Sequence, residues 1–465
     1  MASRQLRFYF PARTLILILI FGEVGILVAS FLLATVLQFR EQSYAVLSYG
    51  YGLYKIAAVV AMGLLCMYYL DFYDTQRIPG RGELQFRVLV VVGTLSLLLG
   101  LLGAIFPPFM VGNYVFLTGL PILTFLLIAW RNVFSAMNGS ERFMQRTLFL
   151  GDGDYSNSIW DEVKSRSALG LKLVGYVSPE GDPVKSDGLS RLGGVEDLGR
   201  IIEEHGIRRV VVTMQDRRGK LPVESLLELK KRGLIIEDAA DFYESVTGRV
   251  PLGSLRLSWL LFSRGFCPSR VLLISKRVIS TVGAFVLLIL TSPLLFVIAL
   301  AILLDTGRPI LFRQKRVGKN GKLFTLYKFR SMRLEEGATE RARPAEEGDE
   351  RFTRTGGWLR KSRMDELPQL CNVLRGDMSF VGPRPFMVEE EFELAKQIPF
   401  YEQRWSVSPG VTGWAQIRRA YCATLADNEE KLSYDLYYIK NMSVSLDLLI
   451  LFETLKILLL TRGSR

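Results

Sequence analysis

Two adjacent carboxylates, Asp365 and Glu366, are the residues best placed to do chemistry, because a run of cations precedes them and rigid Gly/Pro turns follow. The preceding cations are Arg351, Arg354, Arg360, Lys361 and Arg363. A carboxylate in this setting can hold a magnesium ion or attack phosphorus, while arginines neutralise phosphate oxygens. An isolated Asp-Glu pair is more often part of a helix with surface salt bridges, so the interpretation depends on the rest of the chain.

The composition indicates a membrane protein with several domains. The 465 residues suffice for two or three domains, and 49% hydrophobic against 22% charged residues is too apolar for an ordinary soluble enzyme. The net charge of +12 suits anionic lipid or phosphorylated substrates. We expect no nucleic acid as a partner, because the sequence lacks paired zinc ligands and an aromatic RNA-binding pattern. Four distant cysteines and a single histidine, His205, disfavour a disulfide framework, a zinc site and a histidine-based triad.

The N-terminal third contains four apolar stretches of spanning length, about 17–25 residues. They are Thr14–Leu37, Leu53–Leu70, Phe86–Phe106 and Val115–Trp130. Lys and Arg cluster before the first stretch, between the second and third, and after the fourth, so both ends of the bundle are expected in the cytoplasm. We predict a four-helix transmembrane bundle over residues 1–135. Glu23 is costly inside the first stretch, and we favour a neighbouring helix as its partner over a functional role.

Residues 140–268 alternate between short apolar strands and amphipathic helices, which predicts a small parallel, Rossmann-like α/β sheet. The turn Gly151-Asp152-Gly153-Asp154 begins a dinucleotide-binding fingerprint, but Ser156 stands where the third glycine belongs. The two aspartates of this turn also place negative charge where a pyrophosphate would sit. We therefore favour a regulatory or dimerising module, and a homodimer, over a nucleotide-binding module.

A second membrane element, the apolar run 278–304, is interrupted near its middle by Ser292 and Pro293. Proline removes a backbone donor and clashes with the preceding turn, so we expect the helix to kink or break there. Cations flank both ends of the run, a pattern that a single crossing does not satisfy. We predict a re-entrant helix that returns to the cytoplasmic face. The alternative is a kinked span that would place the C-terminal domain outside the cell.

Five ordered motifs in the C-terminal part carry a family resemblance. They are Tyr327–Met332, Met364–Gln369, Arg375–Ser379, Val381–Pro385 and Pro409–Gln416. With these motifs the chain resembles the bacterial sugar transferases, the monotopic polyprenyl-phosphate hexose-1-phosphate transferases that begin capsule and exopolysaccharide assembly. The N-terminal spans and the Rossmann-like module resemble the long form of the family. The resemblance implies an α+β monotopic catalytic domain over residues 270–465, facing the cytoplasm at the bacterial inner membrane.

The resemblance also implies a reaction. Asp365 would attack the sugar-bearing phosphorus of a UDP-hexose of the glucose or galactose type and release UMP, and undecaprenyl phosphate would then take the phosphosugar. Asp365 and Glu366 would hold Mg²⁺, and Glu366 could also assist proton movement. Membrane lipid would surround the domain.

Further residues are assigned to substrate binding by the same resemblance. The implied phosphate-binding residues are Arg360, Arg384, Lys328 and Arg330. The candidates for contacts with the nucleotide sugar are Gln416, Arg418 and Arg419. Many relatives carry Asn-Gly-Arg directly after Trp-Ala-Gln, whereas this chain continues with Ile417-Arg418-Arg419-Ala420. This departure leaves the identity of the sugar open.

Two alternatives remain from the sequence. A membrane-anchored nucleotide-sugar dehydratase or epimerase would need a complete glycine fingerprint and a Tyr-x-x-x-Lys pair, and the only such pair here is Tyr51 with Lys55, at a membrane span. A non-catalytic membrane scaffold of a polysaccharide assembly system is the other alternative, which the intact Asp365-Glu366 motif disfavours.

Overall fold

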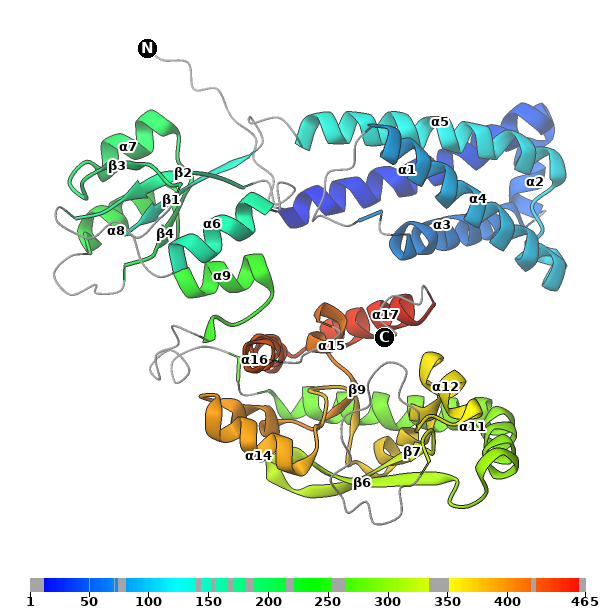
Figure 1. Cartoon of the computed structure of the whole chain (residues 1–465). Coiled ribbons are helices and arrows are strands. Elements are labelled where there is room, and N and C mark those ends of the chain that lie inside the picture. The colour runs from blue at the N-terminus through cyan, green and yellow to red at the C-terminus, as the bar shows by residue number, and fades with distance from the viewer. Residues whose placement is uncertain are drawn as a thin grey trace. The chain divides into compact units, whose positions relative to one another are not determined.

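A computed structural model describes residues 12–49, 51–70, 72–73, 81–138, 144–151, 155–165, 171–179, 188–214, 221–252, 265–266, 268–333, 351–419 and 424–459. The chain divides into two compact units, Met1–Val246 and Thr247–Arg465 (Figure 1).

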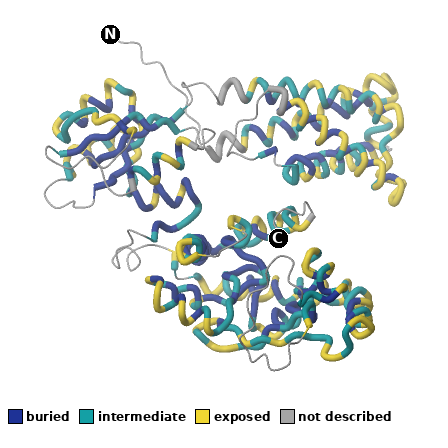
Figure 2. The backbone as a smooth tube through the Cα atoms, viewed as in Figure 1, coloured by how far each residue is buried: buried dark blue, intermediate teal, exposed yellow. Residues whose placement is uncertain are grey.

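Apolar helices form the N-terminal part of the first unit. They are α1 (Ala12–Phe39), α2 (Ser43–Tyr49), α3 (Gly52–Tyr69), α4 (Arg81–Ile105) and α5 (Asn113–Asn138), with 3-10 turns η1 (Arg40–Gln42) and η2 (Pro107–Phe109). Buried and exposed positions alternate along these helices with helical periodicity, so that Leu27 and Phe31 share a core with Leu123 (Figure 2). Helices α1, α3, α4 and α5 are long and apolar enough to cross a membrane, which confirms the four predicted spans as helices of spanning length.

The carboxylate of Glu23 is fully buried between helices and has partners there. Its Oε1 accepts a hydrogen bond from Arg131 Nε at 2.7 Å, and its Oε2 accepts one from the Tyr73 hydroxyl at 2.5 Å. Arg131 also donates to the Phe72 carbonyl at 2.9 Å. Glu23 therefore faces a neighbouring helix, as the structural alternative predicted, and the network ties α1 to α5.

The rest of the first unit is a parallel sheet covered by helices on both faces. Its strands are β1 (Gln145–Leu150), β2 (Leu171–Val177), β3 (Arg191–Gly193), β4 (Arg209–Val212) and β5 (Ile235–Asp238), in the order β3-β2-β1-β4-β5. Its helices are α6 (Tyr155–Ser165), α7 (Leu198–His205), α8 (Val223–Lys231) and α9 (Ala239–Thr247). Side chains alternate across the sheet, so Leu148 and Leu150 belong to one core and Phe149 to the other. The predicted small parallel sheet is confirmed. Asp152, Gly153 and Asp154 lie outside the described residues.

The long helix α11 (Arg270–Thr306) is the first long element of the second unit, and short strands and helices follow it (Figure 1). Its strands are β6 (Leu311–Val317), β7 (Leu323–Phe329), β8 (Ser379–Val381) and β9 (Gly410–Thr412). Its helices are α12 (Arg354–Lys361), α13 (Leu370–Arg375), α14 (Val388–Gln397), α15 (Trp414–Arg418), α16 (Leu425–Lys440) and α17 (Val444–Leu459). Its 3-10 turns are η5 (Lys319–Gly321), η6 (Met364–Gln369) and η7 (Tyr401–Ser406).

Helix α11 continues through Pro293, and a side chain takes over the hydrogen bond that the proline cannot make. Pro293 has no N–H to donate to the Ile289 carbonyl, four residues earlier. The Ser292 hydroxyl donates to this carbonyl instead, at 2.8 Å. The Ser-Pro pair thus keeps the backbone satisfied within an apolar helix, which also ranks among the helices long enough to cross a membrane.

Both ends of α11 pack against the same unit. Near its start, Arg277 Nη1 donates to the Val373 carbonyl at 2.6 Å and so caps the end of α13. At its end, the Asp305 carboxylate accepts from the backbone N–H of Thr355 at 3.1 Å, at the first turn of α12. A straight helix of 37 residues would be about 55 Å long. Despite this length, both ends of the helix contact the domain that follows it in the chain.

Helix α17 presents an apolar face to the outside and a charged residue to the inside. Leu448, Phe452 and Leu455 are exposed, at the spacing of one helical face. Outside this face, Asp447 Oδ2 accepts from Lys276 Nζ of α11 at 2.8 Å. The acidic residue thus serves packing between helices, which leaves the exposed face apolar.

The segment 247–252, between α9 and α11, is built into the second unit. Val250 is 1% exposed and lies in the same core as residues of α16. Its N–H donates to the Ser433 carbonyl at 3.0 Å, and Trp414 Nε1 donates to the Gly248 carbonyl at 2.8 Å. This segment therefore belongs to the compact C-terminal unit. The sequence instead suggested a boundary between the Rossmann-like and C-terminal domains near residue 268.

Candidate active site

The turn η6 positions Asp365 and Glu366. Arg363, just before it, adopts a left-handed backbone conformation with φ of 54°, which turns the chain sharply after α12. The 3-10 turn then continues into α13, whose first residue follows directly. Asp365 is 8% exposed, so the turn points this carboxylate into the protein.

Glu366 is held by two cations. Its Oε1 accepts from Lys328 Nζ at 2.8 Å and from Arg384 Nη2 at 2.8 Å. Burial opposes ionisation, but the charges of Arg384 and Lys328 outweigh it and hold the pKa of the Glu366 carboxyl well below its ordinary range. Glu366 is therefore a permanent anion that brings two of the implied phosphate-binding residues to one point.

Asp365 has the opposite electrostatics. Burial raises the pKa of its carboxyl above the ordinary value, and the charge of Lys328 only partly offsets this. Within the described part of the chain, no group donates a hydrogen bond to the Asp365 carboxylate. Such a carboxylate is poorly solvated and has free lone pairs, which are the properties of a nucleophile.

Lys328 is positioned by a buried asparagine. It lies on β7, and the fully buried Asn372 joins this strand to α13. Asn372 Oδ1 accepts from the Tyr327 N–H at 3.1 Å, and its Nδ2 donates to the Thr325 carbonyl at 2.7 Å. The strand with Lys328 and the helix after Asp365-Glu366 are thereby fixed to each other.

Arg384 lies in the turn after β8, which packs against the turn around β9. A Cβ atom on Gly410 would lie 2.1 Å from the Gly382 nitrogen, so this contact requires glycine. The Gly410 N–H donates to the Pro383 carbonyl at 2.9 Å. The Pro-Gly motif thus shapes the turn that holds Arg384.

Arg404 supports this turn from behind. Its Nη2 donates to the Arg384 carbonyl at 2.9 Å, its Nε to Asp435 at 2.9 Å, and its Nη1 to both oxygens of Glu391 at 3.2 Å. All three charged side chains are almost fully buried. Arg404 therefore acts on the site through Arg384.

The other two implied phosphate-binding residues lie differently. Arg360 is exposed on α12, over the Phe352 ring at 4.7 Å, and its charge acts on Asp365. Arg330 is buried and donates to the carbonyls of Gly307 at 2.6 Å and Arg308 at 3.2 Å. The structure thus brings Arg360 near the acids, whereas Arg330 caps the end of α11.

The residues assigned to the nucleotide sugar are not joined to the acids by any hydrogen bond or ion pair of the described residues. Arg419 pairs with Asp427 at 2.6 Å and Glu430 at 2.7 Å, and Arg418 lies over the Trp414 ring at 4.4 Å. Gln416 Nε2 is buried and has no hydrogen-bond partner among the described residues.

Sequence reasoning missed two contributors to the site, Asn372 and Arg404. Both lie outside the five quoted motifs, and only hydrogen bonds between residues far apart in the sequence show what they hold. Tyr51 and Lys55, the pair considered for a dehydratase, lie at the start of α3 in the helical bundle.

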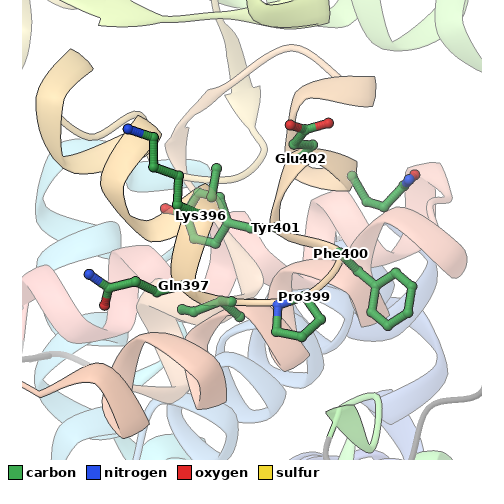
Figure 3. A pocket seen from close by; sticks show the side chains of 9 residues that line it. Lys396, Gln397, Pro399, Phe400, Tyr401 and Glu402 are labelled. Atoms are coloured by element: carbon green, nitrogen blue, oxygen red, sulfur yellow. The ribbon is translucent and has the colours of Figure 1, made fainter.

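A pocket of about 360 Å³ lies elsewhere, at the turn between α14 and η7 (Figure 3). It is lined by residues 395–403, among them Lys396, Tyr401 and Glu402. Neither Asp365 nor the cations around it line this pocket, so it lies outside the candidate site.

The donor set at the acids fits a magnesium ion. Both hydrogen bonds to Glu366 reach Oε1, so its Oε2 accepts none from the described residues, and the Asp365 oxygens accept none either. Mg²⁺ prefers such hard oxygen ligands and is commonly held by one or two carboxylates together with substrate phosphates. Among the described residues, no group of three acidic, histidine or cysteine side chains offers a denser metal site.

Two acids among cations, on a domain with an apolar helix of spanning length, make the turn η6 the candidate site of a membrane-associated α/β protein. Residues 271–461 match the model of the family described as bacterial sugar transferase. The chain belongs to the bacterial sugar transferase family.

Curated relatives show how far this similarity extends. The UDP-N-acetylgalactosamine-undecaprenyl-phosphate N-acetylgalactosaminephosphotransferase of Aeromonas hydrophila is 41% identical over 222 residues, which are 48% of this chain and 52% of the relative. The UDP-glucose:undecaprenyl-phosphate glucose-1-phosphate transferase of Escherichia coli (strain K12) is 34% identical over 315 residues, 65% of each chain. The uncharacterized sugar transferase EpsL of Bacillus subtilis (strain 168) is 40% identical over 195 residues, 41% of this chain and 90% of the relative. This chain thus spans about half to two thirds of the first two relatives.

Proposed function

We propose that this protein transfers a hexose 1-phosphate from a UDP-hexose to undecaprenyl phosphate and releases UMP. The contrast between the two acids carries the proposal: Asp365 is buried and accepts no hydrogen bond from the described residues, whereas Glu366 is clamped by two cations. The names of the A. hydrophila and E. coli relatives support both substrates.

In the first half-reaction, an Asp365 carboxylate oxygen attacks the sugar-bearing phosphorus of the UDP-hexose. A bond forms between this oxygen and phosphorus, and the bond from phosphorus to the bridging oxygen breaks, so UMP leaves with that oxygen. Lys328 and Arg384, already gathered by Glu366, lie beside the reacting phosphate and stabilise its negative charge.

In the second half-reaction, an oxygen of undecaprenyl phosphate attacks the same phosphorus. The bond from phosphorus to Asp365 breaks, and the carboxylate is regenerated. The product is a hexose linked to the lipid by a diphosphate. Splitting the transfer in this way lets one site use a water-soluble donor and a lipid acceptor in turn.

Asp365 and Glu366 would hold Mg²⁺ together with phosphate oxygens of the substrate. When bound, the ion supplies positive charge that neutralises those oxygens and the departing phosphate. Arg360, exposed at the edge of the site, is positioned to meet the donor first. Gln416, Arg418 and Arg419 stay the candidates for contacts with the nucleotide sugar.

The membrane arrangement follows from the second unit. We propose that α11 is re-entrant, because both of its ends are anchored on one domain, and that the apolar face of α17 lies in the membrane interface. The domain would face the cytoplasm at the inner membrane, where the donor is made. A first membrane step of exopolysaccharide or capsule assembly fits this location. The homodimer and the regulatory role of the Rossmann-like module stay predictions.

A panel of UDP-sugars tests the proposal. It includes glucose, galactose and their N-acetylated forms, because the relatives act on different sugars by name. We expect UMP release with at least one donor. The release should require Mg²⁺ and should stop on treatment with EDTA. Absence of UMP with every donor would contradict the proposed reaction and favour the scaffold alternative. Labelling of cysteines in the second unit from outside the cell would contradict the re-entrant arrangement.

A further inference from the structure

Strand β6 carries an arginine that the family-based assignments leave without a role. Arg316 pairs with Phe324 across the β6–β7 hairpin, and Phe312 pairs with Lys328. Residues two and four apart on a strand share a face, and so do directly paired residues of neighbouring strands. Arg316 therefore lies on the same face of the hairpin as Lys328, the cation that contacts Glu366.

The strand also reaches the turn that holds Arg384. An isolated bridge joins Arg316 to Met387, just beyond the Val381–Pro385 motif. Arg316 Nη1 lies 3.5 Å from the Pro385 carbonyl, at the far limit of a hydrogen bond. Arg316 is thus brought to the site from a second direction, beside Arg384.

The guanidinium of Arg316 lacks a compensating anion. Its Nη2 donates to Gln314 Oε1 at 2.6 Å, which is a neutral partner. Its Nε is buried without a hydrogen-bond partner, and among the described residues no carboxylate forms an ion pair with it. Arg404, by comparison, contacts two carboxylates.

Its electrostatic surroundings are those of an anion-binding site. Burial and the neighbouring charge of Arg384 lower the pKa of Arg316 to about 10, although Glu390, Glu391 and Glu366 act in the opposite direction. A buried cation beside a like charge is unfavourable unless an anion joins them. The charge on a phosphate oxygen would satisfy both arginines at once.

We propose that Arg316 is a further substrate-binding residue, which donates to a phosphate oxygen held between it and Arg384. The proposal rests on the proposed transferase reaction. The phosphate belongs either to the UDP-hexose or to undecaprenyl phosphate. Because the lipid takes part only in the second half-reaction, separate assays of the two half-reactions distinguish these possibilities. Lys328, Arg384 and Arg316 would then all face the substrate phosphates.

The experiment compares Arg316→Gln and Arg316→Lys with Lys315→Gln in the full-length protein in nanodiscs. Lys315 is exposed on the opposite face of the same strand and controls for the loss of one charge. Exchange of labelled UMP into the UDP-sugar reports the first half-reaction alone. Transfer to undecaprenyl phosphate reports both.

For a donor phosphate, Arg316→Gln raises the KM for the UDP-sugar by about 10- to 100-fold in both assays. For a lipid phosphate, exchange is preserved and the KM for undecaprenyl phosphate rises by the same factor. In either case Arg316→Lys, which keeps the charge, loses less than Arg316→Gln. KM values of Arg316→Gln within about twofold of those of Lys315→Gln in both assays would overturn the proposal.

A purely structural role predicts a different pattern. Arg316→Gln and Arg316→Lys would then lower the unfolding temperature and kcat equally, with KM unchanged, and the proposal would fail. As a second measurement, methylguanidinium added to Arg316→Ala should restore exchange or transfer, and absence of any rescue counts against the proposal. A wild-type protein inactive with every UDP-sugar contradicts the transferase reaction itself, whereas normal Arg316 variants beside an active wild type contradict only this inference.

Discussion

Asp365 and Glu366 are neighbours in sequence, yet their surroundings assign them opposite chemical states. Lys328 and Arg384 both contact Glu366, so this carboxylate stays ionised and immobile. Asp365 shares the burial but accepts no hydrogen bond from the described residues. Environments that push the pKa values of two acids apart are a common way of dividing roles between them. In the proposed reaction this contrast separates Asp365, the group that reacts, from Glu366, the group that holds the two cations.

The pH dependence of the first half-reaction should follow Asp365. In the proposed reaction its carboxylate form is the nucleophile, and because burial raises its pKa, activity should fall with decreasing pH at values above the ordinary Asp pKa of about 3.9. Lys328→Met removes a charge that favours ionisation and should move this acid limb to higher pH. UMP exchange measured as a function of pH in the wild type and in Lys328→Met checks both predictions. An acid limb at or below the ordinary Asp range would refute the assignment.

Substitutions of the two acids should have opposite effects on stability. Asp365→Asn removes a carboxylate that folding leaves poorly solvated, so stability at neutral pH should be unchanged or higher while exchange falls on the order of 10⁴-fold. Glu366→Gln leaves two cations without their anion and should reduce stability by about 1–3 kcal/mol. This loss is complete above the unfolded Glu pKa of about 4.3 and shrinks as the pH falls below it, because the stabilising form is the carboxylate. Thermal unfolding measured at neutral pH and below about pH 4.3 tests both predictions. Equal changes of the unfolding temperature in the two variants would contradict them.

At the scale of elements, Arg404 joins the helices α14 and α16 to the turn with Arg384. Arg404→Lys keeps the charge but cannot serve Glu391, Asp435 and the Arg384 carbonyl together, because a lysine lacks the planar fork. We expect a loss in kcat of about 10²-fold, since small misplacements of positioning groups have effects of this size. Kinetics of UMP exchange would show it.

Arg404→Met should in addition destabilise the protein by about 3–5 kcal/mol, because it leaves two buried carboxylates unpaired. Arg232→Met is the matched control, since Arg232 pairs with Glu228 at an exposed site, where such pairs contribute at most about 1 kcal/mol. Equal unfolding temperatures for the two variants would show that the Arg404 network is dispensable.

The sequence predicts elements with strong local patterns and fails where contacts are distant. The apolar runs that become α1, α3, α4 and α5 are visible from composition, and so are the buried strands of the parallel sheet. Lys328 and Arg330 look equivalent in sequence, but Arg330 lies just beyond the end of β7 and caps α11. Arg316 depends on the register between β6 and β7, which no local pattern specifies.

At the scale of the whole molecule, the protein combines membrane helices with α/β architecture. Among the described residues, five helices are long and apolar enough to cross a membrane, and the fifth, α11, belongs to the unit with the site. Ile298 and Ile302 of α11 pack against Phe329 and Leu367, next to Lys328 and Glu366 respectively. Helix α11 thus packs directly against the strand that ends beside Lys328 and the turn that carries Glu366.

The Ser292-Pro293 pair allows a test of how α11 stays intact across the proline. Ser292→Ala removes the donor that serves the Ile289 carbonyl next to Pro293. A backbone carbonyl left unsatisfied in an apolar helix should lower the unfolding temperature in nanodiscs, and Thr291→Ala, whose hydroxyl bonds a carbonyl that keeps its helical partner, should not. Equal effects of the two variants would show that the carbonyl at position 289 finds another partner.

The segment 247–252 has a practical consequence for where this protein can be cut. The family match starts at residue 271, yet Val250 fills the core of the same unit and Gly248 accepts from Trp414. A fragment starting at Arg270 would therefore expose the apolar residues of α16 that Val250 covers. It would also leave the indole N–H of Trp414 without its acceptor. We expect a fragment starting at Thr247 to unfold at a higher temperature than one starting at Arg270. The compact unit of this chain therefore begins before the residues that the family match covers.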